Sequence, residues 1–238
     1  MKISVAIPTW ECHGKGDYYL RDLFYSLTKQ TFKEFEVCVS DHSKNNKILS
    51  VCEEYSDLLD IKYYKNSDDR GNSPANTNSA IEMCSADIIK VMFQDDFFYS
   101  NEALGKIVKL FDENLDDYWV LCGTNHTQDD GNSFYGNLIP QWNDNIINGV
   151  NTISSPSVLS IRKEVFDKIQ FDKNLVMMMD CEFYHHAKEI FGEPIYCKEI
   201  LVCNRVHENQ ISSNYLKEDY QEKFDNELLY CREKHKIN

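Results

Sequence analysis

The stretch "MFQDDFF", residues 92–98, places two adjacent carboxylates, Asp95 and Asp96, inside an apolar segment. Burying like charges side by side is costly unless a positive charge joins them. Divalent cations such as Mg²⁺ and Mn²⁺ bind carboxylate oxygens together with the phosphates of a substrate. The pair therefore predicts a divalent metal site that holds a phosphorylated ligand.

Composition and missing motifs narrow the kind of ligand. The first expected strand is followed by neither G-x-x-x-x-G-K-[ST] nor G-x-G-x-x-G, which disfavours P-loop and Rossmann-type cofactor sites. The chain carries 25 Lys and Arg against 39 Asp and Glu, a net charge of -14. Such an acidic surface repels the backbone of nucleic acids, so we expect no nucleic-acid partner and a metal ion between protein and phosphate.

The first hundred residues must position this pair. Their sequence alternates between strand patterns and helix patterns. Apolar runs predict strands over residues 2–8, 35–43, 61–66 and 87–93. Apolar residues spaced i, i+3, i+4, i+7 predict a helix from Tyr18 to Thr28, and further helices are expected over 47–56, 74–84 and about 104–111. This order predicts an α/β fold with a mainly parallel sheet and helices on both faces.

The second half of the chain is less regular. We expect strands over 118–123, 155–161 and 195–207, a helix after "VMMMD", and an amphipathic tail helix from Tyr215. Residues 124–151 are rich in Asn, Asp, Gly and Thr and predict a long functional loop, with a turn at Asp129–Asp130. Because no linker or repeat divides the sequence, we expect one domain over residues 1–238.

Polar segments follow the predicted strands of the first half. In an open parallel sheet, ligands bind beyond the carboxyl ends of the strands, so these segments should meet at one edge. They are Pro8-Thr9-Trp10-Glu11, Asp41-His42-Ser43, Asp68-Asp69-Arg70-Gly71-Asn72 and Gln94-Asp95-Asp96. Each has a simpler alternative: Thr9 and Asp41 could be caps or turn formers, and Arg70 could be a surface charge.

Cysteine usage and hydropathy bear on the cellular compartment. The nine cysteines form no C-x-x-C pair, which favours reduced, buried thiols of a cytoplasmic protein. The N-terminus does not resemble a signal peptide, and we expect no transmembrane segment. The basic residues 232–236 could contact a membrane surface, although a solvated helix face is the simpler interpretation.

Four segments carry a resemblance to a known family. They are "SVAIPTWE", "SLTKQTFKEFEVCVSDHS", "RGNSPANTNSAI" and "ADIIKVMFQDDF". In order and spacing they resemble the N-terminal half of family 2 glycosyltransferases, over roughly residues 1–115. The resemblance implies the GT-A fold, with a nucleotide-sugar-binding half over 1–115 and an acceptor-binding half with the catalytic base over 116–238.

The resemblance also implies roles for the polar segments. Pro8, Thr9, Trp10 and Glu11 would line the nucleotide base, Asp41 would accept a hydrogen bond from a uracil or thymine ring N–H, and Arg70 would lie near the base or diphosphate. Asp95 would contact the ribose or metal-bound water. Asp96 would hold Mn²⁺ or Mg²⁺ against the diphosphate. Phe97 stands where the family often has a third acid, so this motif offers the metal one carboxylate fewer than the family's most acidic motif does.

Two segments of the second half resemble the family more faintly. In "FDKNLVMMMDCEFYHHAKEIFG", Met179 replaces the usual Glu, and Asp180 would be the general base. The alternative is that Asp180 is a helix N-cap. In "NRVHENQIS", His207 would ligate the metal or touch the diphosphate, or be a structural histidine. His185 and His186 indicate a metal site only weakly, because the side chains of neighbouring residues on a helix point apart.

Together these features predict a metal-dependent glycosyltransferase of polysaccharide biosynthesis. It would move a sugar from a nucleotide-sugar donor, a UDP-sugar first, to a sugar, glycan or lipid-linked acceptor with inversion. Phe134, Tyr135 and Trp142 could stack on the acceptor. The alternatives are a nucleotidyltransferase using residues 14–16, a catalytically inactive nucleotide-sugar-binding module, and a retaining enzyme.

Overall fold

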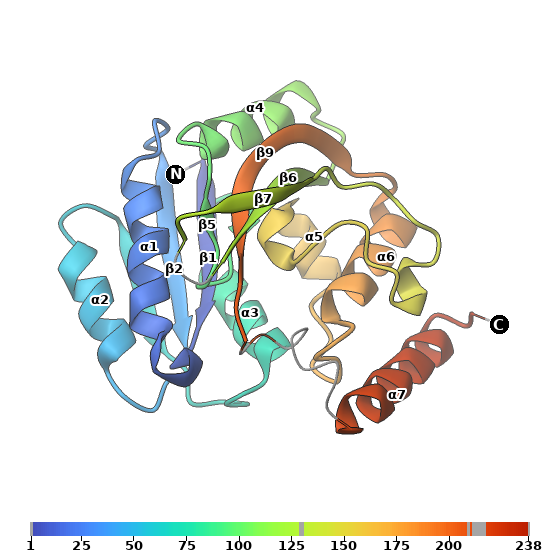
Figure 1. Ribbon diagram of the computed structural model, residues 1–238. Helices are drawn as coiled ribbons and strands as arrows, with labels where there is room; N and C mark the ends of the chain where they lie inside the picture. Colours follow the sequence, from blue (N-terminus) through green and yellow to red (C-terminus); the bar gives the residue numbers. More distant parts are fainter. Residues whose placement is uncertain (1, 129–130, 209, 211–217, 238) are drawn as a thin grey trace.

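The computed structural model describes residues 2–128, 131–208, 210 and 218–237. The predicted turn at Asp129–Asp130 and the predicted start of the tail helix at Tyr215 lie outside the described residues. Figure 1 shows the sheet in the middle of the molecule, with α2 at one end and α7 at the other.

The first half of the chain alternates strands and helices, as predicted. The strands are β1 (Ile3–Thr9), β2 (Phe35–Asp41), β3 (Ile61–Lys65) and β4 (Ile88–Val91). The helices are α1 (Gly16–Thr28), α2 (Lys47–Tyr55), α3 (Ser73–Glu82) and α4 (Ala103–Glu113), with a short 3₁₀ turn, η1 (Cys12–Gly14), before α1. Asn72 caps α3 by accepting a hydrogen bond from the Ala75 N–H at 2.9 Å, and Pro74 occupies its first turn.

The second half contains more structure than its sequence indicates. Its elements are β5 (Phe97–Phe98), β6 (Trp119–Gln128), β7 (Phe134–Leu138), η2 (Ile146–Asn148), η3 (Pro156–Val158), β8 (Leu159–Arg162), α5 (Lys163–Lys168), α6 (Met179–Phe191), β9 (Ile195–Val206) and α7 (Glu218–Lys234). The expected strand over 155–161 is a 3₁₀ turn followed by β8. β5 and α5 are too short for periodicity to reveal them.

The prediction of a long loop over 124–151 is wrong for its first part. β6 continues to Gln128, and β7 pairs with it antiparallel. The segment reads as a loop because its side chains are polar. Yet Thr124 and Asn125 are buried, and Thr124 donates to Asn204 at 2.7 Å. A strand whose buried face meets other polar groups does not show an apolar alternation.

The sheet has the order β3-β2-β1-β4-β8-β6-β9-β5, with β7 paired to β6 outside this path. β1 runs parallel to β2 and β4, and β2 runs parallel to β3. Antiparallel pairs enter with the second half, where β8 joins β4 to β6. β4 lies inside the sheet, which accounts for its apolar sequence. The carboxyl ends of β1, β2 and β4 therefore meet at one edge.

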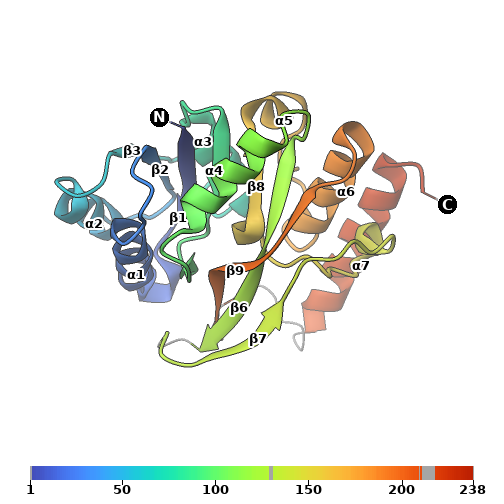
Figure 2. The same cartoon turned by 90° about the horizontal axis from the view of Figure 1, so that it is seen from above.

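One buried apolar cluster extends from Ile3 to Cys231 and includes residues of both halves. Figure 2 shows α1 and α3 on opposite sides of β1, so both faces of this part of the sheet are covered. All nine cysteines are buried free thiols.

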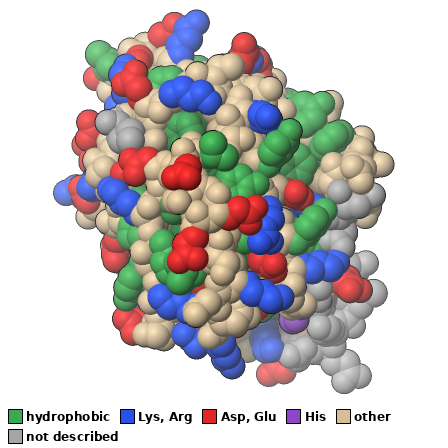
Figure 3. Space-filling view, turned by 90° about the vertical axis from the view of Figure 1, so that its left-hand side faces the viewer, with side chains coloured by type: hydrophobic (Ala, Val, Ile, Leu, Met, Phe, Trp, Pro, Cys, Tyr) green, Lys and Arg blue, Asp and Glu red, His purple; other side chains and the backbone are tan. Residues whose placement is uncertain are grey.

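Three observations concern charged side chains at the surface and the predicted membrane contact of residues 232–236. Figure 3 shows the side of the molecule opposite to α7, where basic side chains are interspersed with acidic ones. Among the described residues, no helix combines the length and the apolar character that a membrane span requires. Two of the basic tail residues contact protein groups: Arg232 donates to Asn148 at 2.9 Å, and Lys234 to Asp172 at 2.6 Å.

Candidate active site

Gln94 joins the carboxyl ends of β1 and β4. Its amide oxygen accepts from the Trp10 N–H at 2.6 Å, and its amide nitrogen donates to the Trp10 carbonyl at 3.0 Å. Gly16 begins α1 against this turn, where a Cβ would lie 2.2 Å from the Trp10 carbonyl oxygen. The Trp10 backbone is thus fixed, while its side chain stays 42% exposed at the sheet edge.

Asp41 is fully buried at the end of β2, and protein groups already bind both of its oxygens. The Ser43 N–H donates to Oδ1 at 2.8 Å, and the Tyr63 hydroxyl and Lys65 Nζ donate to Oδ2 at 2.7 and 2.9 Å. Burial and the contact with Asp41 raise the pKa of Tyr63. Sequence reasoning missed Tyr63 and Lys65, although their spacing of two on β3 places both side chains on one face.

The other predicted nucleotide ligands lie around Asp41. Pro8 and Thr9 are buried at the end of β1, where Thr9 pairs with Asp41 across the strands. Glu11 is half-buried and accepts a hydrogen bond from the Lys44 N–H. Arg70 is exposed in the loop between β3 and α3. Burial, and then the Arg70 charge, lower the pKa of His42.

Asp96 is held by its protein neighbours. Its Oδ2 accepts from Asn204 Nδ2 at 2.7 Å and Ser155 Oγ at 3.4 Å, and its Oδ1 accepts from the Arg205 N–H at 2.9 Å. The side chain is 3% exposed, and burial followed by the charge of Asp95 raises its pKa to about 7. Asp96 thereby connects the end of β4 to β9, and its role as a metal ligand stays a prediction.

Asp95 instead meets His207, the other predicted metal ligand. His207 Nε2 lies 3.0 Å from Asp95 Oδ2, and the side chains are 3% and 19% exposed. The His207 ring stacks on Tyr19 of α1 at a centroid distance of 5.2 Å. Two ligands at roughly 2.1 Å from an ion and at a right angle to each other lie about 3 Å apart. The Asp95–His207 contact is a hydrogen bond in this structure, and its length also equals the spacing of two ligands of one divalent cation.

Arg205 closes the site from β9. Its side chain is fully buried, its Nε donates to the Asp95 carbonyl at 2.9 Å, and its guanidinium pairs with Asp22 of α1 at 2.7 Å. The guanidinium also lies over the Tyr19 ring at 4.8 Å. The segment from Arg205 to His207 is thus fixed between α1 and the acid pair, because the Arg205 N–H binds the Asp96 carboxylate and His207 binds that of Asp95.

Asp180 is the second residue of α6. The residue at the N-cap position is Met178, which makes no side-chain cap bond, so the N-cap interpretation of Asp180 is wrong. Asp180 Oδ2 accepts from Asn151 Nδ2 at 2.8 Å, and Oδ1 accepts from the Cys181 N–H at 2.8 Å. Burial raises the pKa of this half-buried carboxylate to about 6. A carboxylate of this kind is suited to accept a proton.

A hydrogen-bonded path connects Asp180 to the acid pair. Asn151 Oδ1 accepts from the Ser154 N–H at 3.0 Å, Ser154 Oγ donates to Asn204 at 2.9 Å, and Asn204 donates to Asp96 at 2.7 Å. Ser154 has a φ of 116°, a value that favours glycine and that marks local backbone strain. Sequence reasoning missed Asn151 and Asn204, since single asparagines carry no periodic signal.

The segment before Asp180 is held by α7. The Glu227 carboxylate accepts three backbone N–H groups, from Val176 at 3.0 Å, Met177 at 2.8 Å and Met178 at 2.9 Å. A carboxylate at the N-terminus of a helix is favourable, because the first N–H groups have no partner within the helix. Glu227 therefore fixes the start of the helix that carries Asp180.

The three aromatic residues expected to bind an acceptor are not brought together. Phe134 is 47% exposed and contacts Tyr99, beside the acid pair, at a ring distance of 5.3 Å. Tyr135, the next residue of β7, stacks on His126. Trp142 lies under Lys188 of α6 at 4.0 Å. Of the three residues, Phe134 is the one whose ring contacts a residue, Tyr99, that closely follows the acid pair in sequence.

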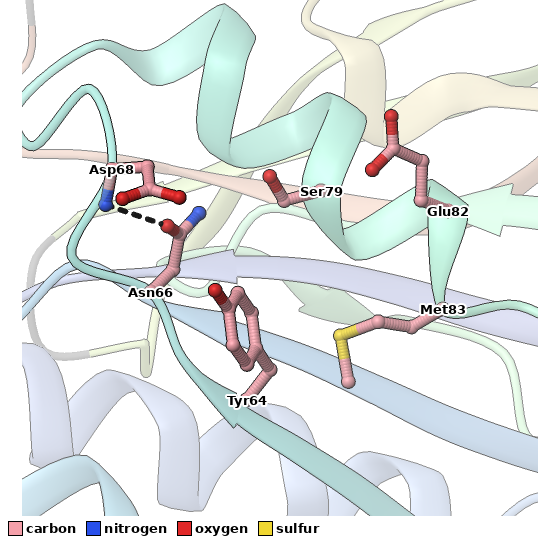
Figure 4. Close-up of a pocket in the computed structure, with 6 residues that line it drawn as sticks. All are labelled: Tyr64, Asn66, Asp68, Ser79, Glu82 and Met83. Atoms are coloured by element: carbon pink, nitrogen blue, oxygen red, sulfur yellow. Dashed lines mark hydrogen bonds between the residues drawn. The ribbon is translucent and has the colours of Figure 1, made fainter.

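A surface pocket of about 330 Å³ lies between β3 and α3 (Figure 4). Its lining residues are Tyr64, Asn66, Asp68, Ser79, Glu82 and Met83. Asp68 lies in the loop that contains Arg70, but none of the side chains predicted to bind nucleotide, metal or acceptor lines this pocket. The candidate active site is therefore the polar cluster at the strand ends, not this pocket.

Comparison with known proteins identifies relatives of this chain and of its fold. The chain is 24% identical over 229 residues to the uncharacterized glycosyltransferase RT0329 of Rickettsia typhi, covering 90% of this chain and 67% of the relative. TarS of S. aureus with UDP superimposes with a TM-score of 0.70 at 21% identity, over 98% of this chain and 72% of the TarS chain.

A second solved structure shares the fold at lower identity. The mannosyltransferase PcManGT of Pyrobaculum calidifontis, in complex with GDP-Man and Mn²⁺, superimposes with a TM-score of 0.68 at 12% identity, over 96% of this chain and 64% of that one. These likenesses confirm the predicted GT-A fold. The family model described as glycosyl transferase family 2 matches residues 4–170, more than half of the sequence, and the chain therefore belongs to glycosyltransferase family 2.

Proposed function

We propose that this glycosyltransferase moves a sugar from a UDP-sugar to an acceptor hydroxyl with inversion, with the help of a divalent cation and with Asp180 as general base. The observation that carries the proposal is the hydrogen-bonded path from Asp180 to Asp96, through Asn151, Ser154 and Asn204. It ties a proton acceptor to the acid pair that ends β4. Both are needed for a displacement at a sugar carbon bonded to a diphosphate.

The donor would bind at the ends of β1 and β2. Thr9, Trp10 and Asp41 would surround the base, with Glu11 and Arg70 at the exposed rim. Lys65 already donates to the Asp41 carboxylate at 2.9 Å. A base N–H that approaches Asp41 would therefore share this carboxylate with Lys65. The preference for uracil draws on the TarS structures with UDP and UDP-GlcNAc, the latter 22% identical with a TM-score of 0.72. The GDP-Man complex of PcManGT keeps a GDP-sugar as the second choice.

Asp95 and His207 would hold Mn²⁺ or Mg²⁺, because their donor atoms meet at 3.0 Å. Such an ion supplies positive charge to the leaving diphosphate. Asp96 then has a positioning role: it keeps β4 and β9 together through Asn204 and the Arg205 N–H. This assignment transfers to Asp95 the role of metal ligand that the family resemblance implies for Asp96.

Asp180 would take the proton of the acceptor hydroxyl. As that oxygen forms a bond to the anomeric carbon, the bond from this carbon to the diphosphate oxygen breaks, and the nucleoside diphosphate leaves with the bonding electrons. A single displacement of this kind inverts the anomeric centre. Asn151 would hold Asp180 in place through its 2.8 Å hydrogen bond, and Phe134 would offer a face to a sugar, glycan or lipid-linked acceptor.

Calorimetry with UDP, UDP-GlcNAc and GDP-Man, with and without Mn²⁺, tests the donor and the metal together. We expect tight binding of the uridine compounds that requires the ion. Release of UDP from the donor in the presence of acceptor sugars, followed by NMR of the product's anomeric proton, separates an inverting enzyme from a retaining one. Donor binding without any turnover over a broad acceptor panel would favour the inactive binding module.

The nucleotidyltransferase alternative has lost its support. It relied on Gly14, Lys15 and Gly16 as a phosphate-binding loop, and these residues lie where α1 begins. Membership of glycosyltransferase family 2 favours transfer of a sugar instead.

A further inference from the structure

A second cluster of metal-binding side chains lies where α6 meets the end of α7. Glu182, His185, His186 and Glu189 of α6 are spaced i, i+3, i+4 and i+7, so they share one face of the helix. His235, the residue after α7, inserts between them: its ring lies 4.9 Å from that of His185 and 5.2 Å from that of His186. Figures 1 and 2 show α6 and α7 side by side. The expectation that the two α6 histidines point apart overlooked a third ring between them.

Glu182 is the centre of this cluster. Its side chain is fully buried, its Oε1 lies 2.8 Å from His235 Nε2 and 3.8 Å from His186 Nδ1, and its Oε2 has no hydrogen-bond partner in the described part of the chain. A buried carboxylate is costly unless a cation compensates it; Lys234 Nζ lies 2.8 Å from Oε1, whereas Oε2 has no partner among the described residues. The ligand atoms of Glu182, His186 and His235 all lie within 4.8 Å of one another.

We propose that Glu182, His186 and His235 form a zinc site that is separate from the Asp95–His207 pair. Two imidazole nitrogens and one carboxylate oxygen are a donor set that Zn²⁺ uses in proteins, whereas Mg²⁺ and Ca²⁺ prefer oxygen alone. Metal-bound histidines usually donate their other ring N–H to a carboxylate. His235 has this partner, because its Nδ1 lies 3.0 Å from Glu189 Oε2.

Lys234 lies beside the proposed zinc site. Its Nζ lies 2.8 Å from Glu182 Oε1 and 2.6 Å from Asp172 Oδ2, so its ammonium group shares the space beside the buried carboxylate. Zinc at the site displaces Lys234 from Glu182, and Asp172 retains it. Lys234 is therefore a competitor of the metal, and its removal strengthens zinc binding.

The site would fasten the end of α7 to α6. Glu227 of α7 holds residues 176–178, which precede Asp180, so zinc stabilises the same contact between the two helices. The effect on Asp180 rests on the proposed function, whereas the zinc site itself does not. A structural role agrees with the burial of Glu182 and of His235, whose side chains are 0% and 5% exposed.

Zinc titration calorimetry on the untagged, chelator-stripped full chain tests the proposal. A His207→Ala background removes a ligand of the other metal site, so the remaining high-affinity zinc belongs to this cluster. We expect one equivalent of zinc to bind. His186→Ala and His235→Ala each weaken binding by more than the about 10- to 100-fold that loss of an orienting partner causes, and Glu189→Gln weakens it within that range. Lys234→Met strengthens it.

His185→Ala is the matched control, since His185 faces Glu189 at 3.5 Å rather than Glu182. Zinc binding should be unchanged in this variant, and circular dichroism should show each variant folded. Mn²⁺-dependent UDP binding in the His186→Ala variant, on the native His207 background, reports separately on the proposed function. Each of the following results would overturn the proposal: no saturable zinc binding, native zinc affinity in His235→Ala, or weaker zinc binding in Lys234→Met. Loss of zinc binding in His185→Ala together with its retention in His186→Ala would also overturn it.

Discussion

Asp96 and Asp180 stand at the two ends of one hydrogen-bonded path, although they belong to different halves of the chain. Asn204 donates to Asp96 at 2.7 Å, Ser154 donates to Asn204 at 2.9 Å, and Asn151 connects Ser154 to Asp180. The path joins the acid pair to the proposed base through the buried Asn204 and the exposed Asn151.

Asn204→Ala should destabilise the fold and lower turnover together. The change removes one hydrogen-bond partner from each of Asp96, Thr124, Ser154 and Ser155, and an unsatisfied buried polar group costs about 1–3 kcal/mol. Urea denaturation measures the loss. The exposed Asn101→Ala is the control, with a change within about 0.5 kcal/mol. Equal stability of the two variants would contradict the path.

Replacing Asp180 with Asn should abolish transfer and spare donor binding. General base catalysis contributes about 10²- to 10⁴-fold, so turnover should fall by this factor while calorimetry with UDP and Mn²⁺ stays unchanged. Native turnover in this variant would rule Asp180 out as the base.

The pH profile tests the same residue through its pKa. A base acts in its deprotonated form, and burial raises the pKa of Asp180 to about 6, so kcat/KM should fall tenfold per pH unit below about 6. The hydrogen bond from Asn151 lowers this pKa. Asn151→Ala should therefore raise it and move the acid limb of the profile to higher pH. An unmoved limb in the variant would show that another group controls the profile.

Glu227→Ala should impair catalysis from outside the site. The variant removes the acceptor of three N–H groups at residues 176–178, at a cost of about 1–3 kcal/mol in the free energy of unfolding. We expect kcat to fall while KM for the donor is unchanged. Glu222→Ala, an exposed residue of the same helix, is the matched control. A change in donor KM alone would argue against a role in positioning Asp180.

The first half of the fold could be predicted because its signals are local. Each strand from β1 to β4 is an apolar run, and the residues that end it, such as Asp41 and Asp96, are adjacent to that run in sequence. The roles of Asn204 and Asn151 could not be predicted, since each depends on partners far along the chain. Asp95 and Asp96 look equivalent in sequence, and the roles proposed for them differ because Asp96 is 3% exposed and the Asp95 side chain 19% exposed.

The second half hides its structure for a related reason. β6 has a polar sequence where its side chains face Asn204, so its strand pattern is lost although the residues are buried. The helix α6 was predicted from its apolar face, but the meeting of its histidines with His235 depends on how α7 packs. Tertiary contacts of this kind leave no periodic signal in the sequence.

Asp95→Asn and His207→Ala should each remove the Mn²⁺ dependence of UDP binding. Each variant takes away one of the two donor atoms that meet at 3.0 Å. Calorimetry with and without Mn²⁺ measures this dependence. Asp112→Asn, a half-exposed carboxylate paired with Lys2, is the control and should bind like the native protein. Retained dependence in both Asp95→Asn and His207→Ala would place the ion elsewhere.

The most direct measurement is the anomalous scattering of Mn²⁺ in crystals of the full chain grown with UDP. The peak should lie within bonding distance of Asp95 Oδ2 and His207 Nε2 and next to the diphosphate, with Asn204 still bound to Asp96. A peak on Asp96 with Asn204 displaced, or UDP bound at the strand ends with no manganese beside it, would contradict this account.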